Sequence, residues 1–264
     1  MSIRIWHQSF TVLSDLSAYG EALRAHFSRV ARPDTEIILH GMRPGTYRSN
    51  YPGEDIKHAG MQYLHGLQFI SAGVEAERQG FDAYAISTLP EPALREVRAL
   101  IDIPVVGYGE SVMLQACTFG EKFGVLVFIS DMKDLIAANV SRHGLERRFA
   151  GVHALPFGFN DILKAFDSPD DLIERFRTSA RALISEGADV IIPGEAPLNV
   201  LLARSGINEI DGVPVLDSLG CWIKQAETLV DLRRSSGVKP CRRGYFSALP
   251  DPERVREVLS FYNL

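Results

Sequence analysis

The sequence predicts an α/β fold with two pseudo-symmetric lobes, each a parallel sheet flanked by helices, and an active site in the cleft between them. The main observation is a duplicated phrase: GFDAYAISTLPEPAL at residues 80–94 and GADVIIPGEAPLNVL at residues 187–201 match at one constant offset. A helix-like pattern precedes each copy, and a short apolar run follows it, IPVVGYG after the first and VPVLDSLG after the second. Strands that alternate with helices in this way form parallel sheets covered on both faces.

The first lobe is predicted to begin with a strand at residues 3–7 (IRIWH). A helix follows from about Asp15, because apolar residues recur there at helical spacing. Residues 35–39 form a second strand, and residues 41–53, rich in Gly, Pro, Arg and Tyr, form a mobile loop. A long helix at residues 55–78 leads into the first copy of the duplicated unit. Its apolar face is predicted to consist of Tyr63, Leu67, Ile70 and Val74.

The second lobe is predicted to begin near Phe123 with the buried strand run GVLVFIS. This run ends at Ser130 and Asp131, which suit the start of a helix that continues through Val140. The later elements are a short strand at 152–155, a helix from Ser168, the second duplicated unit, a helix at 222–233, and a polar tail with one short helix. We therefore assign residues 1–115 plus 215–264 to the first lobe and residues 116–214 to the second.

Composition narrows the class of protein. A hydrophobic content of 46% and a charged content of 23% are typical of globular domains with a sizeable core. The net charge of −5, without a basic stripe, argues against nucleic acid as a partner. No apolar run reaches the roughly 18 residues of a membrane span, and the first residues do not resemble a signal peptide. Three widely spaced cysteines favour a reduced, cytoplasmic setting over disulfides or zinc.

The strand ends are the predicted place for a ligand, because parallel sheets bind ligands beyond the carboxyl ends of their strands. In the two copies of the duplicated phrase, Thr88 and Glu195 occupy equivalent positions just after a strand. We expect them to face each other across the cleft. Other polar residues at or near strand ends are His7, Ser9, Ser87, Glu110, Ser130, Gly194 and Asp217.

The order of elements resembles the aspartate/glutamate/hydantoin racemase superfamily, and within it the hydantoin-racemase-like branch. The matching phrases are FDAYAISTLPEPAL, IDIPVVGYGES, QACTFGEKFGVLVF, GADVIIPGEAP and GVPVLDSLGCWIKQAETLV, which together span roughly residues 3–230. The resemblance implies two α/β lobes with a small-molecule site between them and no cofactor. Typical members use one cysteine from each lobe: one removes a proton beside a carboxyl or carbonyl group, and the other returns a proton on the opposite face.

This chain departs from that pattern at both cysteine positions, where it carries Thr88 and Glu195. Its cysteines, Cys117, Cys221 and Cys241, lie elsewhere, so a two-thiol mechanism is excluded. A threonine hydroxyl is too weak an acid to replace a thiolate base. A carboxylate can act as acid or base, especially if burial raises its pKa.

Each candidate catalytic residue also has a structural interpretation. Glu195 is the predicted acid/base, but a strand-end carboxylate also suits the N-terminus of the next helix. Thr88 is predicted to donate a hydrogen bond to substrate, or alternatively to cap the segment that begins at Pro90. Glu110 belongs to a Gly-Glu-Ser phrase that the resemblance marks as a family feature, and it either takes part in catalysis or ties the lobes together. His7 titrates near neutrality and is either an acid/base or a buried structural group.

Seven residues are predicted to bind substrate: Ser9, Arg48, Tyr51, Ser87, Ser130, Gly194 and Asp217. A loop arginine such as Arg48 can clamp a carboxylate, whereas Asp217 can alternatively cap the helix that contains Gly220. Val127 and Phe128 stand where the family carries hydroxyl residues, so that half of the pocket is expected to be apolar and to favour a ring-bearing substrate. His58 and His65 lack the spacing of metal ligands, and no metal site is expected.

These observations favour a cofactor-independent isomerase or racemase acting on a small amino acid or hydantoin-like substrate, with Glu195 as the principal acid/base. His7 or Glu110 would then serve the second face. A lyase or hydrolase is the first alternative, because decarboxylation, elimination or amide hydrolysis needs only one positioned proton donor or acceptor. A non-catalytic binding protein on the same fold is the second. We expect a small molecule as ligand and a homo-oligomeric assembly.

Overall fold

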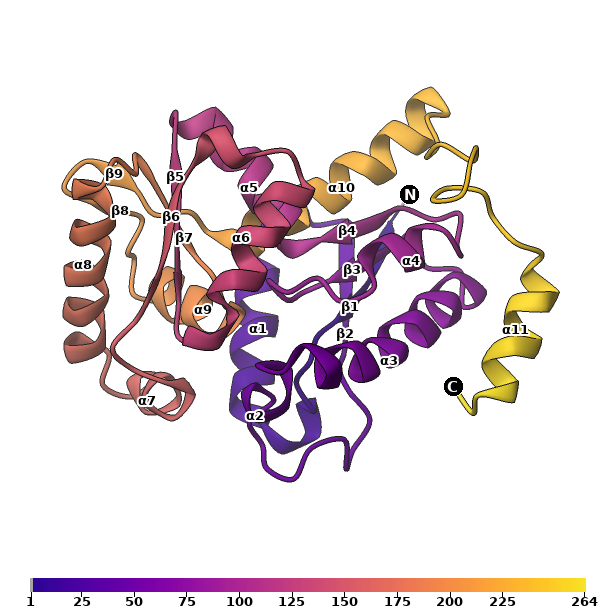
Figure 1. Ribbon diagram of the computed structural model, residues 1–264, viewed down its shortest axis with the longest axis horizontal. Coiled ribbons are helices and arrows are strands. Elements are labelled where there is room, and N and C mark those ends of the chain that lie inside the picture. Colours follow the sequence, from indigo (N-terminus) through magenta and orange to yellow (C-terminus); the bar gives the residue numbers. More distant parts are fainter. Residues whose placement is uncertain (1) are drawn as a thin grey trace.

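A four-stranded parallel sheet forms the first half of the computed structural model, which describes residues 2–264 (Figure 1). Its strand order is β2-β1-β3-β4, and Ile5 pairs with both Ile37 and Ala83. The strands are β1 (Ile3–Gln8), β2 (Thr35–His40), β3 (Ala83–Ile86) and β4 (Val105–Gly107). Because all four strands run parallel, their carboxyl ends meet at one edge of the sheet, as the sequence predicts.

Helices cover both faces of this sheet. The hydroxyl of Tyr84 donates to the carbonyl of Phe69 and ties one face to α3, whereas His7, on the other face, packs against Trp222 of α10. The helices of this half are α1 (Ser17–Val30), α2 (Gly53–Ile56), α3 (Ala59–Arg78), α4 (Leu94–Arg98), α5 (Tyr108–Phe119) and α10 (Ser218–Ser236), with a short 3-10 turn, η1 (Leu13–Asp15). α10 lies against α5 and β4, so the chain returns to the first sheet after it has built the second.

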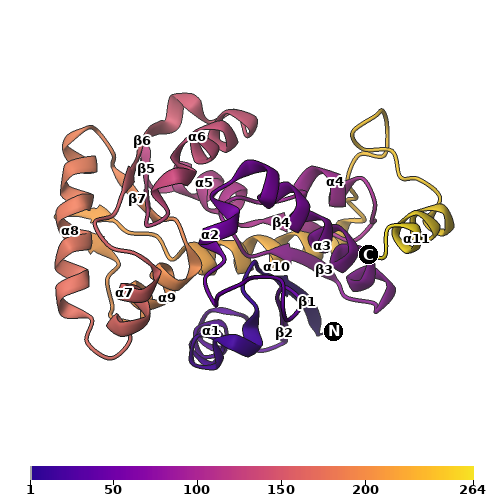
Figure 2. The same ribbon diagram turned by 60° about the horizontal axis from the view of Figure 1, so that its bottom comes forward.

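The second sheet has three parallel strands in the order β6-β5-β7, and it lies beside the first along the long axis of the molecule (Figures 1 and 2). Its strands are β5 (Phe123–Val127), β6 (Phe149–Ala154) and β7 (Val190–Pro193). Around it lie η2 (Ser130–Met132), α6 (Lys133–Arg142), η3 (Glu146–Arg148), α7 (Phe159–Ala165), α8 (Asp170–Ser185), α9 (Ala196–Arg204) and the small antiparallel pair β8 (Glu209–Ile210) and β9 (Val213–Pro214). The two duplicated units therefore contribute β3 and β7, the strands that precede Thr88 and Glu195.

The predicted long helix at residues 55–78 is wrong in two respects. The backbone of His58 is extended, so the segment splits into α2 and α3. The face that α3 buries consists of Gly66, Phe69, Gly73 and Ala76, whereas Tyr63, in the predicted apolar face, is 76% exposed. Gly73 allows this face to be buried, because any larger residue would clash there. A Cβ at Gly73 would lie only 2.6 Å from the side chain of Val97. Small residues bring α3 close to α4, and Met61, Tyr63 and Leu64 turn outward.

The C-terminal segment leaves the two sheets after α10. It crosses α4 as a loop and ends in α11 (Pro252–Phe261), whose N-terminus is capped by Asp251 (Figure 1). Arg242 anchors the loop, because its guanidinium donates to the carbonyls of Arg98 and Ile101 at 2.9 Å each. No helix in the described part of the chain is long and apolar enough to cross a membrane.

Candidate active site

A small cavity of about 70 Å³ lies where the carboxyl ends of the two sheets meet. The segments after β1 and β3, the loop before α2, the turn after β5, α7 and the start of α9 all line it. Its polar or ionisable residues are Ser9, Thr11, Tyr19, Tyr51, Ser87, Thr88 and Glu195. The predicted convergence of Thr88 and Glu195 on one site is therefore confirmed by the structure.

Glu195 follows β7 and holds its carboxylate against the neighbouring strand. The N–H of Phe128 donates to both carboxylate oxygens, at 3.0 and 3.2 Å, and the N–H of Ile129 donates to one of them at 3.1 Å. Glu195 occupies the N-cap position of α9, but its side chain makes no capping hydrogen bond there. The helix-capping alternative is therefore wrong, and the carboxylate is held at the cavity by amides of the turn that follows β5.

Burial dominates the chemistry of this carboxyl group. Glu195 is 7% exposed, and burial raises its pKa from the ordinary 4.5 to about 8, although the amide donors oppose the shift. Neither arginine nor lysine is among the residues that line the cavity, so no cation there favours the ionised form. A group with a pKa near 8 exists in both protonation states near neutral pH. It can therefore accept or donate a proton, as general acid–base catalysis requires.

Ser87 and Thr88, in the turn after β3, also line the cavity. The Ser87 N–H donates to the carbonyl of Gln8 at 2.7 Å, which fixes the turn against β1. The Ser87 hydroxyl is buried and has no hydrogen-bond partner among residues 2–264. Thr88 does not cap α4, because the N-cap residue of that helix is Ala93. Both residues therefore line the cavity, and Thr88 does so without capping a helix.

Aromatic rings form the remaining wall, in agreement with the apolar half-pocket that the sequence predicts. Tyr51, from the loop before α2, stacks on Phe159 of α7 with ring centroids 5.0 Å apart and an interplanar angle of 15°. Phe159 also lies 6.4 Å from the ring of Phe128. Burial, together with the nearby charge of Glu195, raises the pKa of the Tyr51 hydroxyl to about 12. The two lobes therefore meet at an aromatic contact beside Glu195.

The structure does not support the predicted acid/base role of His7. Its ring is fully buried between Phe27 and Trp222, away from the cavity lining. Nδ1 lies 3.1 Å from the carbonyl of His40, and burial lowers the pKa of His7 to about 4. The ring is therefore neutral near pH 7 and cannot serve the second face of a substrate.

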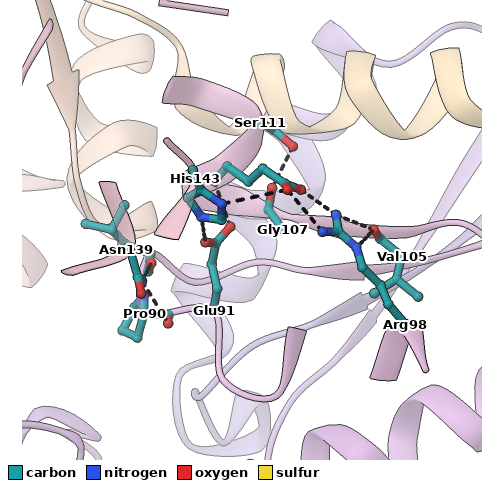
Figure 3. A network of polar contacts seen from close by, with 10 residues as sticks. Pro90, Glu91, Arg98, Val105, Gly107, Ser111, Asn139 and His143 are labelled. Carbon is teal, nitrogen blue, oxygen red and sulfur yellow. Dashed lines mark hydrogen bonds and ion pairs between the residues drawn. The ribbon is translucent and has the colours of Figure 1, made fainter. Parts of the chain in front are cut away.

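Glu110 also lies outside the cavity. Its carboxylate forms an ion pair with Arg98, and its own N–H donates to the carboxylate of Glu91 at 2.7 Å. Glu91 is 2% exposed and lies 2.8 Å from Nε2 of His143, at the end of α6 (Figure 3). Asn139 of α6 donates to the carbonyl of Pro90 at 3.2 Å. Glu110 therefore belongs to a polar network that ties the lobes together, which is the alternative role considered for it.

Of the predicted substrate-binding residues, Ser9, Tyr51 and Ser87 line the cavity. Arg48 and Ser130 are exposed and do not line it. The carboxylate of Asp217 accepts the N–H of Gly220 at 3.0 Å, so Asp217 caps α10 instead of binding substrate. Gly194 is buried beside the site, where a Cβ would lie 2.8 Å from Val127. Its absent side chain lets the turn that carries Glu195 approach β5.

The sequence interpretation missed most of the apolar lining. Tyr19 and Met132 project from helical segments, and Phe159 begins a helix, so none lies at the end of a predicted strand. Glu91 was missed as well, although it follows Thr88 closely and has a left-handed backbone with φ 52°. Within residues 2–264 no cluster of three or more His, Cys, Asp or Glu side chains is arranged to hold a metal ion.

Comparison with known proteins adds to this geometry. Residues 17–226 match the family model described as Asp/Glu/Hydantoin racemase. A hydantoin racemase from Pseudomonas sp. (strain NS671) is 30% identical over 227 residues, which cover 83% of this chain and 86% of that protein. The allantoin racemase from Klebsiella pneumoniae has a similar fold, with a TM-score of 0.77 and 24% identity over 95% of this chain and 94% of that one. The allantoin racemase from Pseudomonas fluorescens gives a TM-score of 0.73 and 25% identity over 95% and 98%.

Proposed function

Because this chain belongs to the Asp/Glu/hydantoin racemase family, we propose that it racemises a small hydantoin-like substrate by proton transfer at the carbon atom beside a ring carbonyl. It is an enzyme of the racemase class. The observation that carries the proposal is Glu195, a buried carboxyl group in the cavity with a pKa of about 8. In this proposal Glu195 takes the place of the second family cysteine.

The amide donors on Glu195 suit it to proton transfer. The N–H groups of Phe128 and Ile129 orient the carboxyl group without a neighbouring cation. Deprotonated Glu195 would remove the proton from the substrate carbon and hold it as the enolate forms. The hydroxyls of Ser87 and Thr88 would donate hydrogen bonds to the enolate oxygen, a form of stabilisation that is worth several kcal/mol where donors are preorganised.

Racemisation also needs a proton donor on the opposite face of the substrate. With His7 and Glu110 outside the cavity, we assign this role to the hydroxyl of Tyr51. It lines the cavity, where burial and, to a smaller extent, the nearby Glu195 carboxylate raise its pKa to about 12. A phenol with this pKa stays protonated at neutral pH, so it can supply a proton to a carbanion. Tyr51 belongs to the first lobe and Glu195 to the second, as the family's two-sided mechanism requires.

The cavity lining favours an uncharged ring over an amino-dicarboxylic acid. Glu195 is the one carboxyl group in it, and the cavity lining contains no arginine or lysine that would bind a substrate carboxylate. Phe128 and Phe159 offer an apolar surface for a ring or its substituent. Hydantoin racemases are among this chain's relatives, which supports the same substrate class.

A lyase or hydrolase is the alternative. The observation that favours it is that Glu195 alone among the residues lining the cavity titrates near neutral pH, and these reactions need only one such group. The products separate the two classes. A racemase changes optical rotation without a change of mass, whereas a decarboxylase or hydrolase changes the mass of its substrate.

The test is proton exchange in heavy water, followed by NMR on 5-substituted hydantoins, allantoin, free amino acids and arylmalonates. Exchange at the substrate carbon should fall at least 100-fold in Glu195→Gln, because general acid–base catalysis typically contributes 10²- to 10⁴-fold. The matched control is Glu121→Gln, whose side chain is 88% exposed, and it should exchange at the wild-type rate. Full activity of Glu195→Gln on a substrate that wild type racemises would refute the role of this residue.

A further inference from the structure

A second, larger cavity of about 310 Å³ lies on the other side of the Glu91 network. Four segments form it: α4 with Arg95 and Arg98, the start of α5 with Glu110, the end of α6 with Arg142 and His143, and the C-terminal loop with Arg242. Figure 3 shows that Arg98 and His143 approach the network from different directions, with Glu91 beside His143. The cavity therefore spans the seam between the lobes, and the C-terminal loop closes it.

Positive charge is in clear excess here. Four arginines line the cavity, Arg95, Arg98, Arg142 and Arg242, against one carboxylate, that of Glu110. Carboxylates neutralise two of these arginines: Arg98 pairs with Glu110, and Arg242 pairs with Asp102 at 3.2 Å. The remaining two, Arg95 and Arg142, have no carboxylate partner among the described residues. The guanidinium of Arg95 lies over the ring of Phe246, 4.7 Å from its centroid, which orients it without neutralising it.

We propose that this cavity binds a small, multiply charged oxyanion, either a phosphate group or a dicarboxylate. Guanidinium groups are suited to such ligands, because their planar N–H donors pair with two oxygens at once. Arg95 and Arg142 bind the anion directly, and the paired Arg98 and Arg242 add to the positive potential around it. The anion thus bridges α4 of the first lobe and α6 of the second.

Part of the site lies beyond the matched family region, although Arg95 and Arg142 lie within it. Arg242 and Phe246 lie in the C-terminal loop, whereas the family model matches residues 17–226. Arg142 directly precedes His143, which contacts Glu91, and the turn that includes Thr88 and Pro90 lines the catalytic cavity. Binding at the seam is therefore expected to stabilise the arrangement of the lobes, and this effect is measurable whether or not the protein is a racemase.

The experiment measures thermal stability and heat of binding with two probes, inorganic phosphate and succinate, each compared with sodium chloride at equal ionic strength. At least one probe should raise the Tm in a saturable manner beyond the effect of chloride, because a ligand that binds only the folded state stabilises it. Arg142→Gln should weaken the apparent affinity at least tenfold. The matched control is Arg204→Gln: Arg204 is exposed and occupies the last turn of α9, as Arg142 does in α6, so both variants lose the same helix-end charge.

Two results would overturn the proposal. The first is a Tm in phosphate and in succinate that equals the Tm in chloride at every concentration. The second is a saturable effect that survives in both Arg142→Gln and Arg95→Gln, because binding would then occur elsewhere. Arg95→Gln provides the independent second variant should Arg142→Gln fold poorly.

Discussion

The N–H of Phe128 donates to both carboxylate oxygens of Glu195, at 3.0 and 3.2 Å, so the candidate acid/base is held by a main-chain group of the turn after β5. This contact orients the carboxyl group, while burial without a cation in the cavity keeps its pKa near 8. An arginine at the same place would orient the group equally well but would lower its pKa. The pairing with a neutral donor is therefore what makes a glutamate usable for proton transfer near neutral pH.

The first prediction concerns stability and pH. Between about pH 4.5 and pH 8 the folded protein keeps a proton on Glu195 that the unfolded chain has lost, so stability falls as pH rises through this window. One pH unit corresponds to about 1.4 kcal/mol, which gives a total loss on the order of 5 kcal/mol over the window. Glu195→Gln removes the titration. In urea unfolding, the free energy of unfolding of Glu195→Gln should equal that of wild type below about pH 4. It should then exceed the wild-type value by an amount that grows with pH and becomes constant above about pH 8.

Glu121→Gln serves as the control for that series, since its exposed side chain should follow wild type at every pH. A constant difference between Glu195→Gln and wild type across the series would show that Glu195 has an ordinary pKa in the folded protein. The proposed acid/base role would then lose its electrostatic support.

The second prediction separates two buried serines. The Ser87 hydroxyl has no partner within the described chain, whereas the Ser111 hydroxyl donates to the carbonyl of Gly107. Ser87→Ala should therefore leave the free energy of unfolding within about 1 kcal/mol of wild type but lower kcat/KM by about 10- to 100-fold, because a hydrogen bond to the substrate is lost. Ser111→Ala should do the opposite, with reduced stability and unchanged kcat/KM. Equal kcat/KM in Ser87→Ala and wild type would remove Ser87 from the site.

The duplicated phrase was sufficient to predict the two parallel sheets and the meeting of Thr88 and Glu195. Sequence symmetry carries this information, because equivalent positions after equivalent strands lie at the same edge of each sheet. The resemblance to the racemase family also predicted that Phe128 would make its side of the pocket apolar, because family members carry hydroxyl residues there. The rule that parallel sheets bind ligands beyond the carboxyl ends of their strands identifies the turns that can form a site. It does not say to which face of the sheet a side chain points. His7 therefore met the rule and yet lies buried against Trp222.

Long-range partners account for the other differences. Nothing near Glu110 in the sequence shows that Arg98 neutralises it, or that Glu91 accepts its N–H. Likewise, the predicted apolar face of α3 was wrong, because the buried face is set by the close approach of Gly73 to Val97 of α4. That approach depends on tertiary packing and is not visible in the local sequence. Helical periodicity gives the spacing of a face, whereas the neighbouring element decides which face is buried.

The third prediction concerns the seam between the lobes. Glu91 accepts the N–H of Glu110 and contacts His143, so Glu91→Gly should leave two buried donors without a partner and lower stability by about 2–4 kcal/mol. Glycine suits the left-handed backbone, with φ 52°, so the loss would come from the missing carboxylate and not from strain. Glu91→Gln keeps an acceptor oxygen and should lose less. Urea unfolding measures both variants, and equal stability of Glu91→Gly and wild type would contradict the structural role of this contact.

The last prediction separates two functions of Tyr51. Tyr51→Phe keeps the ring that stacks on Phe159 but removes the hydroxyl proposed to protonate the second face. The proton at the substrate carbon should then still exchange with heavy water through Glu195, while racemisation slows at least 100-fold. Chiral chromatography combined with NMR would detect this as deuterium uptake with retention of configuration.

Tyr51→Ala tests the stacking separately. The cavity of about 70 Å³ is smaller than the usual range of pockets for small molecules, which begins near 300 Å³, so we expect the Tyr51 and Phe159 rings to separate when substrate enters and to close over it afterwards. Loss of the ring should raise KM by about tenfold in addition to the loss of racemisation, because an aromatic pair contributes about 0.5–1.5 kcal/mol beyond its buried area. Phe159→Leu, which keeps the hydroxyl of Tyr51, should raise KM without separating exchange from racemisation. If Tyr51→Phe racemised at the wild-type rate, the second proton would have to come from another hydroxyl in the cavity, and Thr88, which occupies the position equivalent to Glu195, would be the residue to change next.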